Sequence, residues 1–129
     1  MNTTSVPTKE FYDRIKKFQS NIKSAGLDAC LVHATESDMA NVRYLSEYWP
    51  TFETAAVLVP DEGEAVLLVG PESENYAAHR SFFKNIEIMI EYRESAEPEV
   101  DCANFIRRGS GSAGVLDRYL RHQGHPAGK

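Results

Sequence analysis

Two apolar runs separated by a short turn constrain the fold more than any other feature of this sequence. Ala55 to Val59 and Ala65 to Val69 flank the segment PDEGE, whose proline, aspartate and glycine are residue types that favour turns. Apolar runs of this length, bounded by turn signals, are typical of paired strands. Neither run alternates strictly between apolar and polar residues, so we expect both faces of this β-hairpin to be covered. The rest of the chain has to supply those covering layers.

The segments before the hairpin predict two helices and a strand. An apolar stripe indicates an amphipathic helix over residues 8–26, with Thr8 as its N-cap and Gly26 as its stop. The stripe consists of Phe11, Ile15, Phe18 and Ile22. Residues 28–33 are apolar and are expected to form a buried strand. A short helix over residues 38–45 follows, and Pro50 has to end or bend the segment after it.

The segments after the hairpin predict a further helix and strand. Residues 71–83 indicate a helix, and residues 86–91 alternate cleanly, as a strand at a sheet edge does. Three isoleucines are expected on one face of that strand: Ile86, Ile88 and Ile90. Residues 87, 89 and 91 are expected on the other. The order of elements predicts an α/β fold with three layers, a mixed sheet with helices on both faces.

Charge divides the chain into two parts. The 129 residues suit one domain, and the net charge is −5. Residues 1–104 carry nine basic and eighteen acidic side chains, whereas residues 105–129 carry five and one. We expect 1–104 to be the folded domain and 105–129 to be a divergent, poorly ordered tail, because it is Gly-rich and has no periodic apolar face. The acidic body argues against nucleic acid as a partner.

Other sequence signals bear on location and on chemistry. No apolar run approaches the roughly 20 residues of a membrane span, and the N-terminus has no secretory pattern, so we expect a cytoplasmic protein without membrane contact. The chain contains no H-E-x-x-H, C-x-x-C or G-x-S-x-G pattern. Cys30 lies in an apolar run and is interpreted as a small core residue. We therefore expect no catalytic residue, metal or cofactor in this chain.

One glycine-rich segment leaves an alternative open. Gly109 to Gly114, GSGSAG, matches the dinucleotide-binding pattern G-x-G-x-x-G. That pattern works after a strand, with an acidic residue about 20 positions further on. Here the preceding residues predict a helix, and no acidic residue follows Asp117. A flexible connection is the favoured interpretation, and a small nucleotide-binding α/β protein is the alternative.

The order of several motifs resembles the N-terminal domain of the creatinase/prolidase/aminopeptidase P family. The resemblance covers about residues 9–100, and its motifs are Arg14, the segment GLDACLV at residues 26–32, the segment ANVRYLS at residues 40–46, and the hairpin. The family pattern around the third motif is Asn-x-x-Tyr-Leu-Thr/Ser-Gly-aromatic. This sequence keeps four of its positions, Asn41, Tyr44, Leu45 and Ser46, and has Glu47 where glycine is usual.

The resemblance implies a non-catalytic role. It implies a ribonuclease-H-like α/β domain that helps to assemble the oligomer and gates substrate at a neighbouring active site. Two divalent metal ions, held by two Asp, one His and two Glu, would belong to a separate C-terminal pita-bread domain. The expected partners are a second copy of the chain or such a catalytic domain. The composition change after residue 104 suggests a truncated or frame-shifted Xaa-Pro aminopeptidase- or creatinase-like protein. One alternative is a short standalone relative. The other is a subunit paired with a separately encoded metallopeptidase chain.

The loop after the third motif is the expected contact surface. Its candidate residues for substrate gating or subunit contact are Arg43, Tyr48, Trp49 and Phe52. Tyr44 and Leu45 are expected to pack the motif against the sheet. For Trp49 and Phe52 the alternative is that they complete the domain's own core, since large aromatic side chains are usually well buried. Glu47 leaves the backbone path open, because glycine readily supplies a positive φ.

Overall fold

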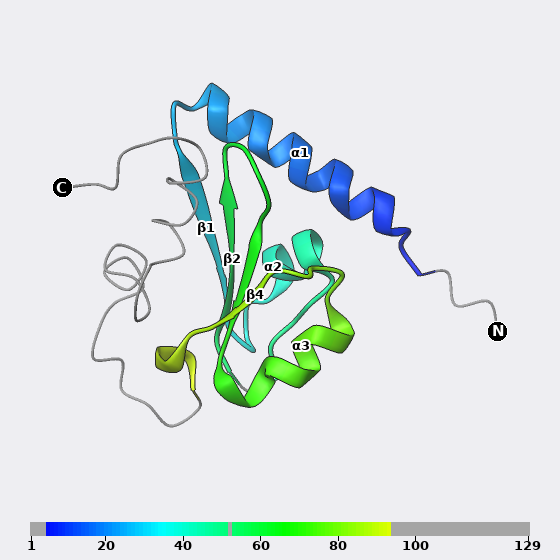
Figure 1. Cartoon of the computed structure of the whole chain (residues 1–129), viewed down its shortest axis with the longest axis vertical. Coiled ribbons are helices and arrows are strands. Elements are labelled where there is room, and N and C mark those ends of the chain that lie inside the picture. The colour runs from blue at the N-terminus through cyan, green and yellow to red at the C-terminus, as the bar shows by residue number, and fades with distance from the viewer. Residues whose placement is uncertain (1–4, 52, 94–129) are drawn as a thin grey trace. The chain divides into compact units, whose positions relative to one another are not determined.

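The predicted hairpin forms the centre of a mixed four-stranded sheet. The structure is a computed structural model that describes residues 5–51 and 53–93 of the chain. Its strands are β1 (Ala29–Ala34), β2 (Ala55–Pro60), β3 (Val66–Val69) and β4 (Ile86–Ile88). They lie in the order β1-β2-β3-β4 (Figure 1). β2 pairs antiparallel with both β1 and β3, and β4 runs parallel to β3. The predicted α/β class and mixed sheet are confirmed.

Helical segments connect the strands. In the described part of the chain these are α1 (Thr8–Ser24), α2 (Ala40–Ser46), η1 (Pro71–Ser73), α3 (Glu74–Arg80) and η2 (Ile90–Tyr92). The two η segments are short 3₁₀ turns. All described residues belong to one compact unit, Met1–Glu94. The predicted domain boundary after residue 104 and the tail 105–129 lie outside the described residues.

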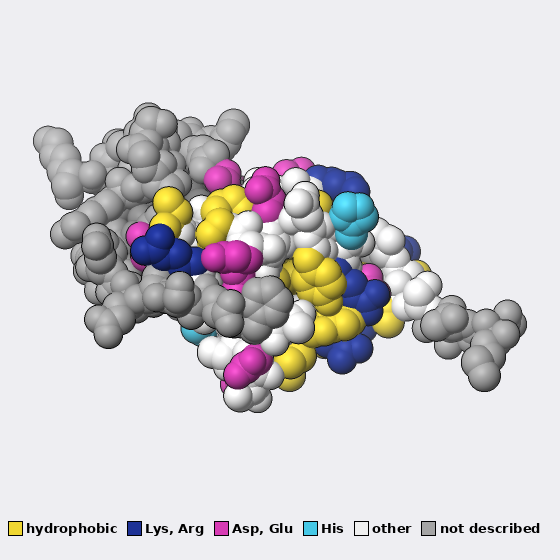
Figure 2. All heavy atoms as spheres, turned by 90° about the horizontal axis from the view of Figure 1, so that it is seen from below, with side chains coloured by type: hydrophobic (Ala, Val, Ile, Leu, Met, Phe, Trp, Pro, Cys, Tyr) yellow, Lys and Arg dark blue, Asp and Glu magenta, His cyan; other side chains and the backbone are white. Residues whose placement is uncertain are grey.

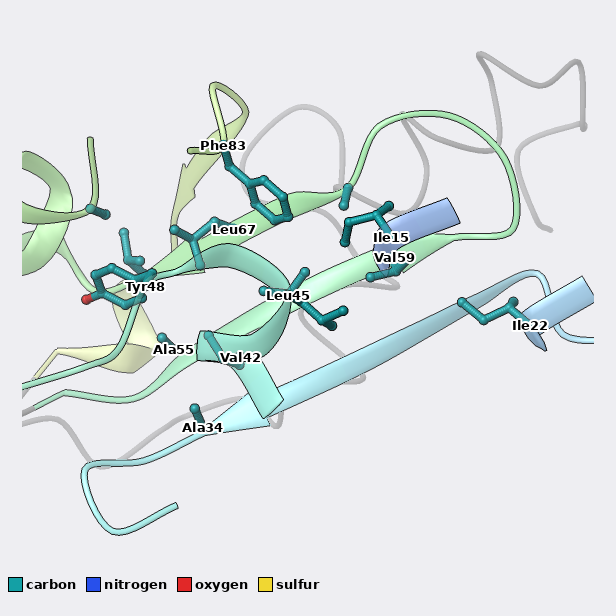
Figure 3. Close-up of a cluster of buried hydrophobic side chains, with 14 residues drawn as sticks. Ile15, Ile22, Ala34, Val42, Leu45, Tyr48, Ala55, Val59, Leu67 and Phe83 are labelled. Carbon is teal, nitrogen blue, oxygen red and sulfur yellow. The ribbon is translucent and has the colours of Figure 1, made fainter. Parts of the chain in front are cut away.

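One face of the sheet and the three α-helices enclose the core. Val32 lies opposite Val57, and Val57 lies opposite Leu67, so these side chains share a face. The buried cluster on this face also takes residues from α1, α2 and α3 (Figure 3). Its main members are Ile15, Ile22, Val42, Leu45, Tyr48, Val57, Val59, Leu67, Val69, Ala77 and Phe83. Every residue of β2 and β3 is buried, which confirms that both faces of the hairpin are covered.

The opposite face of the sheet meets η2. His33 lies between Val32 and Ala34 in β1, and both of those pack with the helical face, so the His33 side chain projects to the other side. There its ring lies 5.7 Å from the ring of Tyr92, in an edge-to-face arrangement. Helical segments therefore lie on both sides of the sheet, with the longer ones on one side.

The first helix ends as the sequence predicts and begins one residue earlier than expected. Gly26 has φ +71°. Its N–H donates to the Lys23 carbonyl, and the Leu27 N–H donates to the Ile22 carbonyl, the paired bonds of a Schellman motif. At the other end Thr8 is the first helical residue instead of the N-cap, since Pro7 occupies the N-cap position without a side-chain hydrogen bond.

The two edge strands differ from their predictions. β1 was expected to be buried, but it lies at the sheet edge and most of its residues are only half-buried. The alternation predicted for residues 86–91 stops after Ile88. Met89 is buried and Ile90 is 60% exposed, because the 3₁₀ turn that begins at Ile90 replaces the two-residue period of a strand by a three-residue period.

Glu47 adopts the backbone conformation that glycine favours. It caps the C-terminal end of α2 with φ 62° and ψ −5°, in the left-handed region. Its N–H donates to the Arg43 carbonyl at 2.9 Å. The turn after α2 thus follows a path that suits glycine, although the residue carries a Cβ, and this conformation costs a non-glycine residue about 1 kcal/mol.

Replacing Glu47 by glycine is therefore expected to stabilise the chain. We expect the free energy of unfolding to rise by about 1 kcal/mol, because glycine carries no penalty at a positive φ. Urea denaturation followed by circular dichroism measures the change. Glu74→Gly is the matched control: residue 74 begins α3 with φ −53°, a conformation in which glycine has no advantage, so the same substitution there is expected not to stabilise the chain. Equal effects of the two substitutions would contradict this account.

Candidate functional site

Ser46 fixes the loop that follows helix α2. Its hydroxyl donates a hydrogen bond to the Val42 carbonyl at 2.7 Å and accepts one from the Tyr48 N–H at 3.1 Å. Its own carbonyl accepts a hydrogen bond from the Ser81 hydroxyl at 3.1 Å. Ser46 is fully buried, so these bonds satisfy polar groups that water does not reach. One motif residue therefore joins α2, the loop and the end of α3.

Tyr48 is a core residue, not part of an exposed surface. Its side chain is fully buried, and its ring centroid lies 5.6 Å from that of Tyr76. Figure 3 shows it among the buried side chains around Leu45 and Leu67. The expectation that Tyr48 belongs to a contact surface is wrong for this reason: the turn fixed at Ser46 directs its ring inward. Leu45 is buried, as expected.

Trp49 lies close to two arginines at the surface. The Arg43 guanidinium lies 4.5 Å from the indole ring centre, and the Arg80 guanidinium lies 4.1 Å from it. The indole is half-buried, and both arginines are exposed. We call these three residues the Trp49 stack. Neither guanidinium forms a hydrogen bond or ion pair with the residues that the structure describes.

The Trp49 stack combines charge with a rigid aromatic ring. Cations over an indole face are attracted to its π electrons, which restrains all three side chains. Figure 2 shows a face of the molecule on which hydrophobic side chains lie directly beside Lys and Arg side chains. Arg80 was not predicted from the sequence, because 31 positions separate it from Trp49 and no local pattern links the two. This surface can bind a carboxylate and cover apolar atoms at the same time.

Tyr44 is exposed and contacts helix α1. Its side chain is 54% exposed, so the expectation that it packs against the sheet is wrong. Its ring lies 4.3 Å from the Arg14 guanidinium, and its carbonyl accepts a hydrogen bond from Arg14 at 2.9 Å. Arg14 also donates to the Glu10 carboxylate at 3.0 Å and lies over the Phe11 ring at 5.0 Å. Tyr44 thus holds α1 against α2.

Glu53 is a buried carboxyl group that the sequence analysis missed. It is only 4% exposed, and neither of its oxygens has a hydrogen-bond partner among the described residues. Gly70 lies so close that a Cβ there would come within 2.7 Å of the Glu53 Oε2. The pKa of Glu53 is raised to about 7, chiefly by burial. The neighbouring Glu72 carboxyl also raises this pKa, and its effect is larger than the opposite effect of the Ser73 hydroxyl. Its place beside an apolar strand was the signal available in the sequence.

The remaining candidates are either exposed or not described. Asn41 is exposed at the start of α2. Cys30 is a half-buried free cysteine that packs against the core, as expected. Phe52 and the glycine-rich segment 109–114 lie outside the described residues. Within residues 5–51 and 53–93, no three His, Cys, Asp or Glu side chains are arranged to hold a metal ion. In the same part of the chain, no helix is long and apolar enough to cross a membrane.

These features define a small α/β domain with a mixed sheet, three helices on one face and an arginine–aromatic surface beside α2. The family model of the creatinase/prolidase N-terminal domain matches residues 14–120. The chain therefore belongs to the creatinase/prolidase N-terminal domain family. A search of curated protein sequences finds no significant match.

Solved structures agree with this assignment. The N-terminal domain of the cytoplasmic peptidase PepQ from Mycobacterium tuberculosis H37Rv is 30% identical, with a TM-score of 0.54, over 62% of this chain and 58% of that one. The N-terminal creatinase/prolidase-like domain of a Corynebacterium diphtheriae protein shares the fold at 14% identity and a TM-score of 0.57, over 91% and 90% of the two chains. The prolidase from Pyrococcus horikoshii OT3 shares it at 18% identity and a TM-score of 0.56.

The chain corresponds to part of some of these proteins. The match to the P. horikoshii prolidase includes 86% of this chain but only 29% of the prolidase. In the match to the PepQ domain it covers a little over half of that chain. The fold is shared with these proteins.

Proposed function

We propose that this chain acts as the non-catalytic N-terminal domain of an Xaa-Pro aminopeptidase- or prolidase-like metallohydrolase. Its role is to bind a catalytic domain or a neighbouring subunit and to gate substrate there. The family match and the likeness to N-terminal domains support this proposal. A cytoplasmic location fits the relative named as a cytoplasmic peptidase. The described residues contain no ligand set for the two divalent ions of such enzymes, and we assign no hydrolytic step to them.

The Trp49 stack is the observation that supports this role best. Trp and Arg are the residue types that most often dominate the binding energy of protein interfaces. Here an indole in contact with both Arg43 and Arg80 offers apolar area with little side-chain freedom left to lose on binding. The guanidinium donors, which have no partner among the described residues, suit carboxylates on the partner, and a bidentate pair fixes orientation as well as affinity. The loop that carries Trp49 is held in place by buried Ser46, so the stack is positioned before binding.

Sedimentation velocity tests the proposal. The full chain is examined alone and with a purified pita-bread catalytic domain of a prolidase, and we expect it to associate with the catalytic domain or with itself. Trp49→Ala is expected to weaken that association at least tenfold, on the order of a hot-spot residue. Tyr12→Ala is the control, because Tyr12 is an aromatic side chain on α1 that is 54% exposed and lies outside the Trp49 stack. No association of the wild-type chain, or equal effects of the two variants, would overturn the proposal.

An activity assay tests the non-catalytic part separately. We expect the purified chain to leave Xaa-Pro peptides intact in the presence of added Mn²⁺. Turnover that follows the 129-residue chain through purification would show that the chain is itself an enzyme.

A further inference from the structure

The outer edge of β1 presents peptide groups to its surroundings. The Asp61 N–H donates to the Asp28 carbonyl, which identifies residues 28 and 61 as a hydrogen-bonded pair of the β1–β2 ladder. Such pairs alternate along an antiparallel ladder. The register then makes residues 30, 32 and 34 hydrogen-bonded to β2 as well. The N–H and C=O groups of Leu31 and His33 consequently point away from the sheet, and within the described residues no strand lies beyond β1.

A groove runs beside this edge. Its volume is about 560 Å³, within the range of protein sites that bind ligands. Leu31 and His33 line it from β1, together with Lys17 of α1 and Asn41 and Tyr44 of α2. Because these residues come from three separate elements, the groove exists only in the folded domain.

The lining of the groove is basic although the protein as a whole is acidic. It includes Arg14 and Lys17, and no Asp or Glu side chain among residues 5–51 and 53–93 lines it. Arg14 is committed to Glu10 and to the Tyr44 carbonyl. Lys17 is exposed and forms no hydrogen bond or ion pair with the described residues. Its ammonium group is thus the cation available to a negatively charged ligand.

We propose that this groove binds an extended peptide segment with acidic side chains, which adds to β1 as a further strand. A single strand edge offers alternating donors and acceptors, and a peptide main chain is the ligand that complements both. Alternate side chains of the bound segment point into the groove. A carboxylate among them reaches Lys17, and the amide of Asn41 can accept or donate beside it. This site is separate from the Trp49 stack and goes beyond the proposed function.

Titration of the ¹⁵N-labelled full chain tests the proposal. The probe is a seven-residue peptide, acetylated and amidated at its ends, in which threonine and glutamate alternate. We expect its binding to shift the backbone amide signals of Leu31 and His33 and to slow their hydrogen exchange. Lys17→Glu is expected to weaken binding at least tenfold. Lys16→Glu makes the same charge change at an exposed neighbouring position outside the groove and is expected to leave binding unchanged.

Three further probes separate strand addition from simple charge attraction. A peptide in which lysine replaces glutamate is expected not to bind. The acidic peptide with N-methylated alternate residues is expected to lose at least tenfold in affinity, since it cannot donate to the strand edge. Retained affinity after N-methylation, or the same amide shifts from glutarate alone, would overturn the proposal. Trp49→Ala is expected to leave peptide binding unchanged, and far-ultraviolet circular dichroism confirms that each variant is folded.

Discussion

Replacing Leu67 by alanine is expected to lower the free energy of unfolding by about 3 kcal/mol, the middle of the range for leucine in a close-packed core. Leu67 lies in the central strand β3, between Val57 of β2 and Ile86 of β4, and is fully buried. Alanine leaves a cavity there, because residues of two neighbouring strands hold the backbone in place and prevent collapse around the smaller side chain. Urea denaturation measured by tryptophan fluorescence and by circular dichroism gives the change.

Leu27→Ala is the matched control for Leu67→Ala. Leu27 follows the end of α1 and is 52% exposed, so the same substitution is expected to change the free energy of unfolding by less than about 0.5 kcal/mol. Similar losses for both substitutions would mean that the cluster around β3 is not the core of the fold.

The second large effect is a dependence of stability on pH that comes from Glu53. Its pKa in the folded chain is about 7, above the ordinary value of 4.5. Below pH 4.5 the Glu53 carboxyl is neutral in both the folded and the unfolded chain, so its ionisation does not lower the free energy of unfolding. Between pH 4.5 and 7 it ionises in the unfolded chain only, so stability falls as pH rises. The difference between these two pKa values corresponds to a loss of about 3 kcal/mol in the free energy of unfolding.

Glu72, the closest charged neighbour, does not offset this effect. The neighbouring Glu53 carboxyl group lowers the pKa of Glu72, so Glu72 stays ionised throughout the window in which Glu53 titrates. Glu53 therefore accounts for the loss of stability with rising pH.

Glu53→Gln isolates the contribution of the carboxyl group. Glutamine has the same shape and stays neutral, so we expect the variant to lose the decline between pH 4.5 and 7 and to be more stable than the wild type at pH 8. Urea unfolding at a series of pH values measures both quantities. Glu64→Gln removes an exposed carboxylate in the hairpin turn and serves as the control. Parallel pH profiles for wild type and Glu53→Gln would show that Glu53 is not a buried neutral acid.

Local patterns predicted the elements of this fold well. The hairpin followed from two apolar runs and a turn, and the stop of α1 followed from Gly26, because both signals lie within a few residues of the structure that they specify. β4 was predicted too long, since the pattern at residues 86–91 fits a strand equally well. It ends early because a 3₁₀ turn begins at Ile90, directly after the last hydrogen bond to β3, which the Met89 N–H donates to the Val69 carbonyl at 2.8 Å.

The candidate site was less accessible to sequence reasoning. Trp49 was singled out from its neighbours in the sequence, and its role at an interface stays a prediction. Arg80, which completes the Trp49 stack, comes from a different helix. Tyr48 and Trp49 are adjacent and equally aromatic, yet one is buried and the other is half-exposed. The difference arises from the Ser46 hydrogen bonds that set the direction of the turn. These bonds cannot be predicted from the composition of the segment.

The connections between the strands have a consequence for the order in which the domain assembles. Only β2 and β3 join across a short turn, whereas α2 lies in the connection from β1 to β2, and η1 and α3 lie in the connection from β3 to β4. Closing those two longer loops costs entropy before any contact repays it. The β2–β3 hairpin is therefore expected to form first and β1 and β4 to dock later, and the three-residue β4 is expected to be the first strand to detach when the native state fluctuates.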